Sequence, residues 1–135
     1  MYITKGIISF ADCDFAGVLF YGKIFELVHK VFEEYLESQN YYKDYFRNSE
    51  IIYPIIHCDA TYVKPLSAGD IVTYILKLKT IRASSFELEY DILKEGDELA
   101  ASVNSVHLAI LKTVGGKIEI PSVLRDQLET LKCEK

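Results

Sequence analysis

The residues with the clearest chemical potential form the short run Asp12-Cys13-Asp14, which precedes Gly17 and an apolar stretch. If this run is extended, side chains two residues apart point to the same side, so the two carboxylates share a face. A carboxylate can attack an acyl carbonyl or take a proton from water. It can equally accept hydrogen bonds from the backbone of a loop. The residue types alone leave both roles open.

A second feature is the start of a helical pattern that has no capping side chain. Neither Ser, Thr, Asp nor Asn occurs between Val18 and Gly22, although these residues usually cap a helix. Uncapped N–H groups, with the helix dipole behind them, bind anions, including the oxyanion of an attacked carbonyl. A carboxylate just before such a helix start favours acyl-transfer chemistry. The alternative is that water or a neighbouring loop caps this end.

Three other candidates are weaker. His57 and Asp59 alternate on a predicted strand and share a face, as a catalytic pair would, but a hydrogen-bonded structural histidine is the commoner case. Cys13 could be a nucleophile, but flanking aspartates raise the pKa of a thiol and disfavour the reactive thiolate. The histidines lack HExxH spacing and the cysteines lack CxxC spacing, so no metal site and no disulfide framework is predicted.

Composition narrows the class of protein. The chain has 135 residues and a net charge of -5, so we expect one domain over residues 1–135 and no nucleic-acid partner. No apolar run is long enough to span a membrane, and the start lacks the layout of a signal peptide, which predicts a cytoplasmic protein without membrane association. The basic stretch Lys77, Lys79 and Arg82 could meet phosphates, or be a solvated strand end.

The periodicity predicts the elements that position these residues. Apolar residues at spacings of three and four predict a long helix over 22–38, whose wide apolar stripe suits a helix wrapped by a sheet. A Tyr-rich connection, predicted as a short helix or irregular loop, follows at 39–54. Strands are predicted at 2–10, 55–64, 71–81, 85–93, 99–112 and 118–120, with a closing helix over 121–132. One helix followed by several hairpins indicates an α+β fold with an antiparallel sheet.

Two segments also resemble a known family. "FADCDFAGVLFYGKIFEL" (10–27) and "PIIHCDATYVKPLSAGD" (54–70) look like the hotdog-fold acyl-CoA thioesterases of the 4-hydroxybenzoyl-CoA thioesterase type, and the likeness spans roughly residues 4–130. Within that family the look is closest to the 1,4-dihydroxy-2-naphthoyl-CoA thioesterases. The resemblance implies an antiparallel sheet wrapped around one long helix, a homodimer or homotetramer, and hydrolysis of an aromatic acyl-CoA without cofactor or metal.

The resemblance also implies roles for single residues. Asp14 matches the catalytic carboxylate of the family, the backbone N–H of Tyr21 matches the oxyanion donor, and Gly17 matches the glycine before the turn, where we expect it to allow close backbone approach. The candidate substrate-binding residues are His57, Arg82, Ser84 and Ser85, of which the last three fall in the region that usually meets CoA.

Alternatives to an aromatic acyl-CoA thioesterase remain at this point. One is a thioesterase for short aliphatic acyl groups. Another is a hotdog hydratase or dehydratase, for which His57 and Asp59 are the nearest candidate pair. The third is a module that binds acyl-CoA without reacting. Release of a free thiol separates the hydrolases from the other two.

Overall fold

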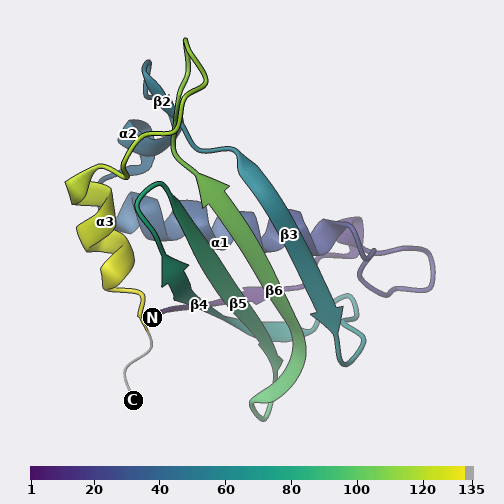
Figure 1. Ribbon diagram of the computed structural model, residues 1–135. Helices are drawn as coiled ribbons and strands as arrows, with labels where there is room; N and C mark the ends of the chain where they lie inside the picture. Colours follow the sequence, from purple (N-terminus) through teal and green to yellow (C-terminus); the bar gives the residue numbers. More distant parts are fainter. Residues whose placement is uncertain (133–135) are drawn as a thin grey trace.

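The longest helix, α1 (Lys23–Ser38), crosses one face of a curved antiparallel sheet (Figure 1). The computed structural model describes residues 1–132. The main sheet has five strands in the order β1-β4-β5-β6-β3, and β2 and β7 form a separate pair. The elements in chain order are β1 (Tyr2–Ile7), the 3₁₀ turn η1 (Phe10–Asp12), α1, α2 (Tyr42–Phe46), β2 (Ile51–Ile52), β3 (Ile55–Tyr62), β4 (Ile71–Ile81), β5 (Ser85–Lys94), β6 (Glu98–Leu108), β7 (Ile110–Leu111) and α3 (Ser122–Glu129).

Alternation along the central strands explains why the sheet and helix pack together. On β4 and β5 every second residue is buried, as the period-two pattern predicts. These side chains meet the apolar stripe of α1, in which Ile24, Phe32 and Leu36 are wholly buried. The predicted α+β architecture, with an antiparallel sheet around one long helix, is therefore confirmed. Among the described residues, no helix has the length and apolar character needed to cross a bilayer.

Two predicted strands differ from the structure near the carboxyl end. The strand expected over 99–112 is interrupted at Ala109, whose N–H donates to the Ser84 carbonyl oxygen at 2.7 Å. The prediction of a strand over 118–120 is wrong. Ile118 and Ile120 donate singly to the carbonyls of Ala109 and Ala83, so no ladder of hydrogen bonds forms.

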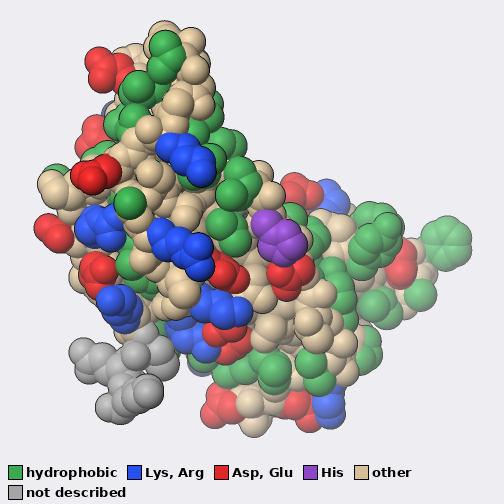
Figure 2. All heavy atoms as spheres, in the orientation of Figure 1, with side chains coloured by type: hydrophobic (Ala, Val, Ile, Leu, Met, Phe, Trp, Pro, Cys, Tyr) green, Lys and Arg blue, Asp and Glu red, His purple; other side chains and the backbone are tan. Residues whose placement is uncertain are grey.

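The outer face of the sheet, turned away from α1, is polar. Lys77 lies 2.8 Å from an oxygen of Asp91 and 3.2 Å from one of Glu89, and Lys79 lies 3.7 Å from one of Glu87. Figure 2 shows this face, where basic and acidic side chains are interleaved over the strands. The basic stretch of the sequence is thus largely paired with carboxylates from β5.

A buried polar group interrupts the inner face. His107 on β6 is 1% exposed and stacks on Phe86, with ring centroids 4.7 Å apart. Its Nε2 lies 2.8 Å from Ser105 Oγ, and its Nδ1 lies 3.5 Å from the Tyr45 hydroxyl. Burial, together with the nearby His29, lowers the pKa of His107 to about 3, so the ring is neutral in the folded protein.

This lowered pKa predicts a loss of stability in mild acid. Between pH 6.5 and about 3 the unfolded chain binds a proton at this position and the folded chain does not, so stability falls as pH falls through that window. Going from pH 7.5 to 5.5 should therefore cost wild type about 1.4 kcal/mol more than His107→Gln. Urea unfolding at both pH values measures this difference. An equal pH dependence in both proteins would contradict it.

Candidate active site

The segment before α1 forms a tight hairpin that holds Asp14. The Asp14 N–H donates to the Val18 carbonyl at 2.9 Å, and the Phe20 N–H donates to the Asp12 carbonyl at 3.0 Å. Cys13 and Leu19 form a bridge between these two pairs. Asp14 therefore lies on one arm of the hairpin, and the other arm leads directly into α1.

The Asp14 carboxylate is anchored through one of its two oxygens. Oδ1 accepts hydrogen bonds from the N–H groups of Ala16 at 2.9 Å and Val18 at 3.3 Å. Within residues 1–132, Oδ2 has no hydrogen-bond partner, and the residue is exposed. The loop thus fixes the carboxylate and leaves one oxygen available to a substrate, so the backbone-bonding role and the chemical role coexist.

Gly17 makes the turn of this hairpin possible. Its φ is +82°, a region that side-chain-bearing residues rarely adopt. A Cβ at this position would meet no atom within 4 Å. The glycine therefore serves the backbone conformation, and the close approach that we expected is not made by any part of this chain that the structure describes.

A substitution tests this conformational role. Gly17→Ala should lower the free energy of unfolding by about 1 kcal/mol, because alanine is strained at positive φ. Gly116→Ala is the matched control, since its Cβ would also meet nothing within 4 Å and its φ is not positive. Urea unfolding compares the two. Equal stability of both variants would show that the left-handed backbone is not required.

The start of α1 is bare, as the sequence predicts. Its N-cap, Gly22, makes no side-chain capping bond. In the chain up to residue 132, the Tyr21 N–H has no hydrogen-bond acceptor. The Tyr21 carbonyl, in contrast, accepts a bond from the hydroxyl of Tyr62 at the end of β3. This bond ties the helix start to the sheet edge and leaves the N–H side open.

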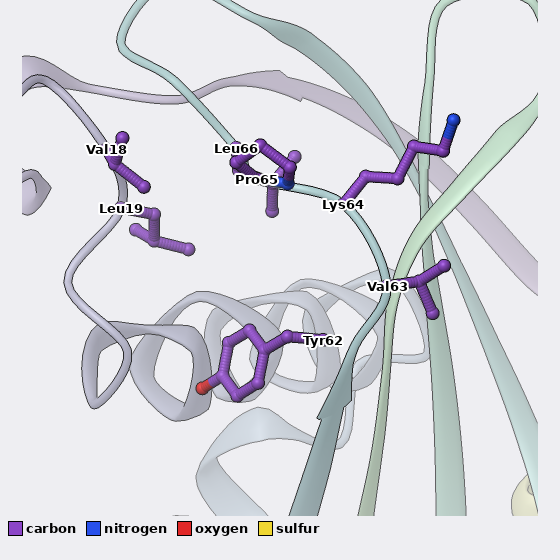
Figure 3. A pocket seen from close by; sticks show the side chains of 7 residues that line it. All are labelled: Val18, Leu19, Tyr62, Val63, Lys64, Pro65 and Leu66. Atoms are coloured by element: carbon purple, nitrogen blue, oxygen red, sulfur yellow. The ribbon is translucent and has the colours of Figure 1, made fainter.

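A cavity lies between the hairpin and the chain that leaves β3. Its volume is about 330 Å³. Figure 3 shows Tyr62 reaching toward the start of α1, with Val18 and Leu19 on the hairpin across from it and Lys64 extending away. The lining residues are Val18, Leu19, Tyr62, Val63, Lys64, Pro65 and Leu66. A mostly apolar space thus adjoins the hairpin of Asp14.

His57 and Asp59 form a pair, but on the other face of the sheet. His57 Nε2 lies 3.1 Å from Asp59 Oδ2, and Asn104 on the outer face donates to Asp59 Oδ1 at 3.1 Å. The hydrogen bond from Asn104, followed by that from His57, lowers the pKa of the Asp59 carboxyl. The predicted shared face is confirmed, but the structure does not bring this pair together with the Asp14 hairpin.

Arg82, Ser84 and Ser85 lie at the turn between β4 and β5, far from Asp14. Ser85 is in register with Leu108, whose N–H donates to the Pro54 carbonyl, so this turn lies near the Ile55 end of β3. The Asp14 hairpin lies near the Tyr62 end of β3. An eight-residue strand separates the two ends by roughly 24 Å.

Sequence reasoning missed two residues at these places. Arg125 on α3 donates through Nη2 to the carbonyl of Arg82 at 2.6 Å, which adds a second guanidinium to that turn. Tyr62 is bonded to the helix start. Neither residue belongs to a local motif. Both contacts join segments that are far apart in the sequence, so no local pattern identifies them.

The surroundings of Cys13 disfavour its reactive thiolate form. Desolvation and the charges of Asp14 and Asp12 raise the pKa of the Cys13 thiol, as predicted. Its Sγ donates to the Ser9 carbonyl at 3.4 Å. Across residues 1–132, no three His, Cys, Asp or Glu side chains lie close enough together to hold a metal ion.

A curved antiparallel sheet around one long helix defines the hotdog fold, and in this chain Asp14 lies on the hairpin that leads into the bare amino end of that helix. The chain belongs to the Thioesterase-like superfamily, whose family model matches residues 8–128. The predicted family and its class, the thioester hydrolases, are therefore confirmed.

Individual relatives agree with this assignment. The chain is 35% identical to a 1,4-dihydroxy-2-naphthoyl-CoA hydrolase of Trichodesmium erythraeum, over 81% of either chain. It is 28% identical to the enzyme of that name from Nostoc punctiforme, over 91% of this chain and 83% of the relative. The structure of a 1,4-dihydroxy-2-naphthoyl-CoA thioesterase from Synechocystis superposes with a TM-score of 0.86 at 22% identity, over 96% of each chain, and so shares the fold.

Proposed function

We propose that this protein hydrolyses an aromatic acyl-CoA thioester to the free acid and CoA. One observation carries the proposal: Asp14 presents an unpaired carboxylate oxygen on the same hairpin that leads into the uncapped start of α1. Relatives with 28% and 35% identity are named hydrolases of 1,4-dihydroxy-2-naphthoyl-CoA, and this compound is the leading candidate substrate. 4-Hydroxybenzoyl-CoA is a smaller aromatic candidate.

The proposed chemistry uses two groups of the hairpin. The thioester carbonyl oxygen accepts a hydrogen bond from the Tyr21 N–H, where the helix dipole stabilises the negative charge that develops. Asp14 either attacks the carbonyl carbon, forming an anhydride that water later cleaves, or takes a proton from the attacking water. In both routes the C–S bond breaks, CoA leaves as the thiolate, and one water is consumed to give the free acid.

Replacing the carboxylate tests this proposal. Asp14→Asn keeps the backbone-bonding oxygen but removes the charge, so we expect kcat to fall at least 1000-fold with little change in stability. Thiol release from 1,4-dihydroxy-2-naphthoyl-CoA and 4-hydroxybenzoyl-CoA, detected with a thiol reagent, measures the rate.

Asp12→Asn is the matched control, because Asp12 lies in η1 on the same arm and serves the hairpin through its backbone carbonyl. It should keep most of the activity. If Asp14→Asn retained full turnover, the assignment would be wrong. If wild type released no thiol from any acyl-CoA but still bound it, the protein would be a binding module.

We also propose a homodimer joined through β3, and the exposure of that strand supports it. β3 is the edge of the main sheet, and its residues 55–59 are all exposed. Ile56 is 57% exposed, whereas Val103 and Ser105, on the neighbouring strand and facing α1, are at most 6% exposed. An open, partly apolar edge strand is a site for pairing with another strand. A second copy of β3, paired antiparallel about a two-fold axis, covers it.

This dimer also gives the CoA-binding candidates a role. Antiparallel pairing about a two-fold axis brings the Ile55 end of one β3 to the Tyr62 end of the other. The turn with Arg82, Ser84 and Ser85 would then lie near the Asp14 hairpin of the opposite protomer, although the two are far apart within one chain. Two guanidiniums, those of Arg82 and Arg125, suit the phosphates of CoA.

A charge on the edge strand tests the dimer. Ile56→Lys places an ammonium group at the proposed interface and should convert the dimer to a monomer, with loss of activity because each site then lacks the partner's turn. Val114→Lys alters an equally apolar residue, 73% exposed, away from β3 and should change neither property. Analytical ultracentrifugation and thiol release measure both. A wild-type monomer, or an Ile56→Lys dimer, would refute this interface.

A further inference from the structure

A second, smaller cavity lies between α1 and the sheet. Its volume is about 40 Å³, more than the 10–15 Å³ or so that one water needs. The walls are mostly apolar, and two hydroxyl-bearing residues lie at the sheet side. The cavity is lined by Phe25, Val28 and His29 of α1, Ile55 and Cys58 of β3, Val103 and Ser105 of β6, and Tyr90 of β5.

The sheet side of this cavity is part of a buried chain of polar groups. Ser105, 6% exposed, lies with its Oγ 2.8 Å from His107 Nε2, and Tyr45 closes the chain on the other side of the ring. Tyr90, 1% exposed, borders the same cavity, and burial raises the pKa of its hydroxyl, which the adjacent Ser105 partly offsets. All of these groups are neutral near pH 7.

Such a chain is costly in an apolar core. Burying a hydroxyl without full hydrogen bonding is unfavourable, because the group loses its hydrogen bonds to water. A serine hydroxyl can donate one bond and accept two. His107 engages one of these three positions and the Tyr90 hydroxyl engages another, so one position remains. Ser105 therefore retains bonding capacity at the wall of a cavity that no side chain of residues 1–132 fills. Stacking against Phe86 holds the His107 ring in place. Through its contact with Ser105 Oγ, the ring in turn fixes the position of the serine hydroxyl.

The cavity lies within reach of the proposed reaction centre. Phe25 is the third residue of α1, and Val28 follows one turn later. From Tyr21 to Phe25 the helix rises by about 6 Å, which is on the scale of one aromatic ring. An acyl group whose carbonyl meets the Tyr21 N–H can therefore extend along α1 toward Ser105.

We propose that Ser105 is a specificity-determining residue that hydrogen-bonds a hydroxyl substituent on the aromatic ring of the acyl group, and that His107 is the positioning residue that orients it. The inference rests on the proposed function and deepens it: the substrates are hydroxyaryl thioesters. Phe25, Val28 and Val103 line the cavity, whose volume of about 40 Å³ admits the hydroxyl-bearing edge of the ring and not the whole ring. A ring without the hydroxyl leaves Ser105 with unused bonding capacity and binds less well.

A matched pair of substrates tests this role. Wild type should have a kcat/KM for 4-hydroxybenzoyl-CoA at least tenfold above that for benzoyl-CoA. Ser105→Ala should bring this ratio close to one, chiefly through the hydroxylated substrate, and change benzoyl-CoA turnover less than threefold. Ser102→Ala is the control, because Ser102 lies on the same strand but on the outer face, where it donates to Asp91 at 2.9 Å. It should keep the wild-type ratio.

The positioning role of His107 has its own variants. His107→Gln, whose amide can still meet Ser105, should keep most of the preference for the hydroxylated substrate. His107→Leu should lose the preference as Ser105→Ala does. Circular dichroism and thermal melts establish that each variant is folded, and Ser105→Thr, which keeps the hydroxyl, supplies a further comparison if Ser105→Ala does not fold.

Binding separates failure of this inference from failure of the proposed function. Thioether analogues that cannot be hydrolysed, 4-hydroxyphenacyl-CoA and phenacyl-CoA, are compared by calorimetry with wild type and Ser105→Ala. If wild type hydrolyses neither thioester, the hydrolase proposal fails, and a tenfold Kd preference that disappears in Ser105→Ala still supports the serine. An equal ratio in wild type and Ser105→Ala, in turnover or in binding, overturns the inference.

Discussion

The packing of α1 against the sheet is the interaction on which the other features depend. Burial of side chains such as Ile24, Phe32 and Leu36 contributes about 1.5–3 kcal/mol each. This contact fixes the helix axis, and with it the position of the helix's amino end relative to the hairpin. The bond from Tyr62 to the Tyr21 carbonyl then ties that end to the edge of the sheet. An oxyanion site made of backbone N–H groups works only where the helix cannot shift.

Polar side chains occupy three regions around this core. The Asp14 hairpin stands at the exposed end of α1, the ion pairs cover the outer face, and the chain of Tyr45, His107 and Ser105 lies inside. Burial sets the charge state of the inner chain, since desolvation keeps His107 neutral. A neutral polar group within an apolar wall can recognise a hydroxyl without attracting charge, and this suits selection among uncharged aromatic rings.

Much of this could be predicted from local patterns. Alternation on β4 and β5 and the three-four spacing on α1 report which faces are buried, because those periods follow directly from backbone geometry. The absence of a cap before Lys23 likewise predicted a bare helix start, since capping is a local interaction. The break at Ala109 was missed because its cause is a bond to Ser84, a partner distant in sequence.

The sequence by itself determined the helix, the strand faces, and the carboxylate and bare N–H groups that make up the candidate site, because each depends on neighbours within a few residues. Tertiary structure alone decided that His57 and Asp59 face away from α1, that Arg125 joins the turn of Arg82, and that Ser105 borders a cavity. These facts depend on register between strands and on which face the helix covers. Those are set by packing of the whole chain, which no local pattern encodes.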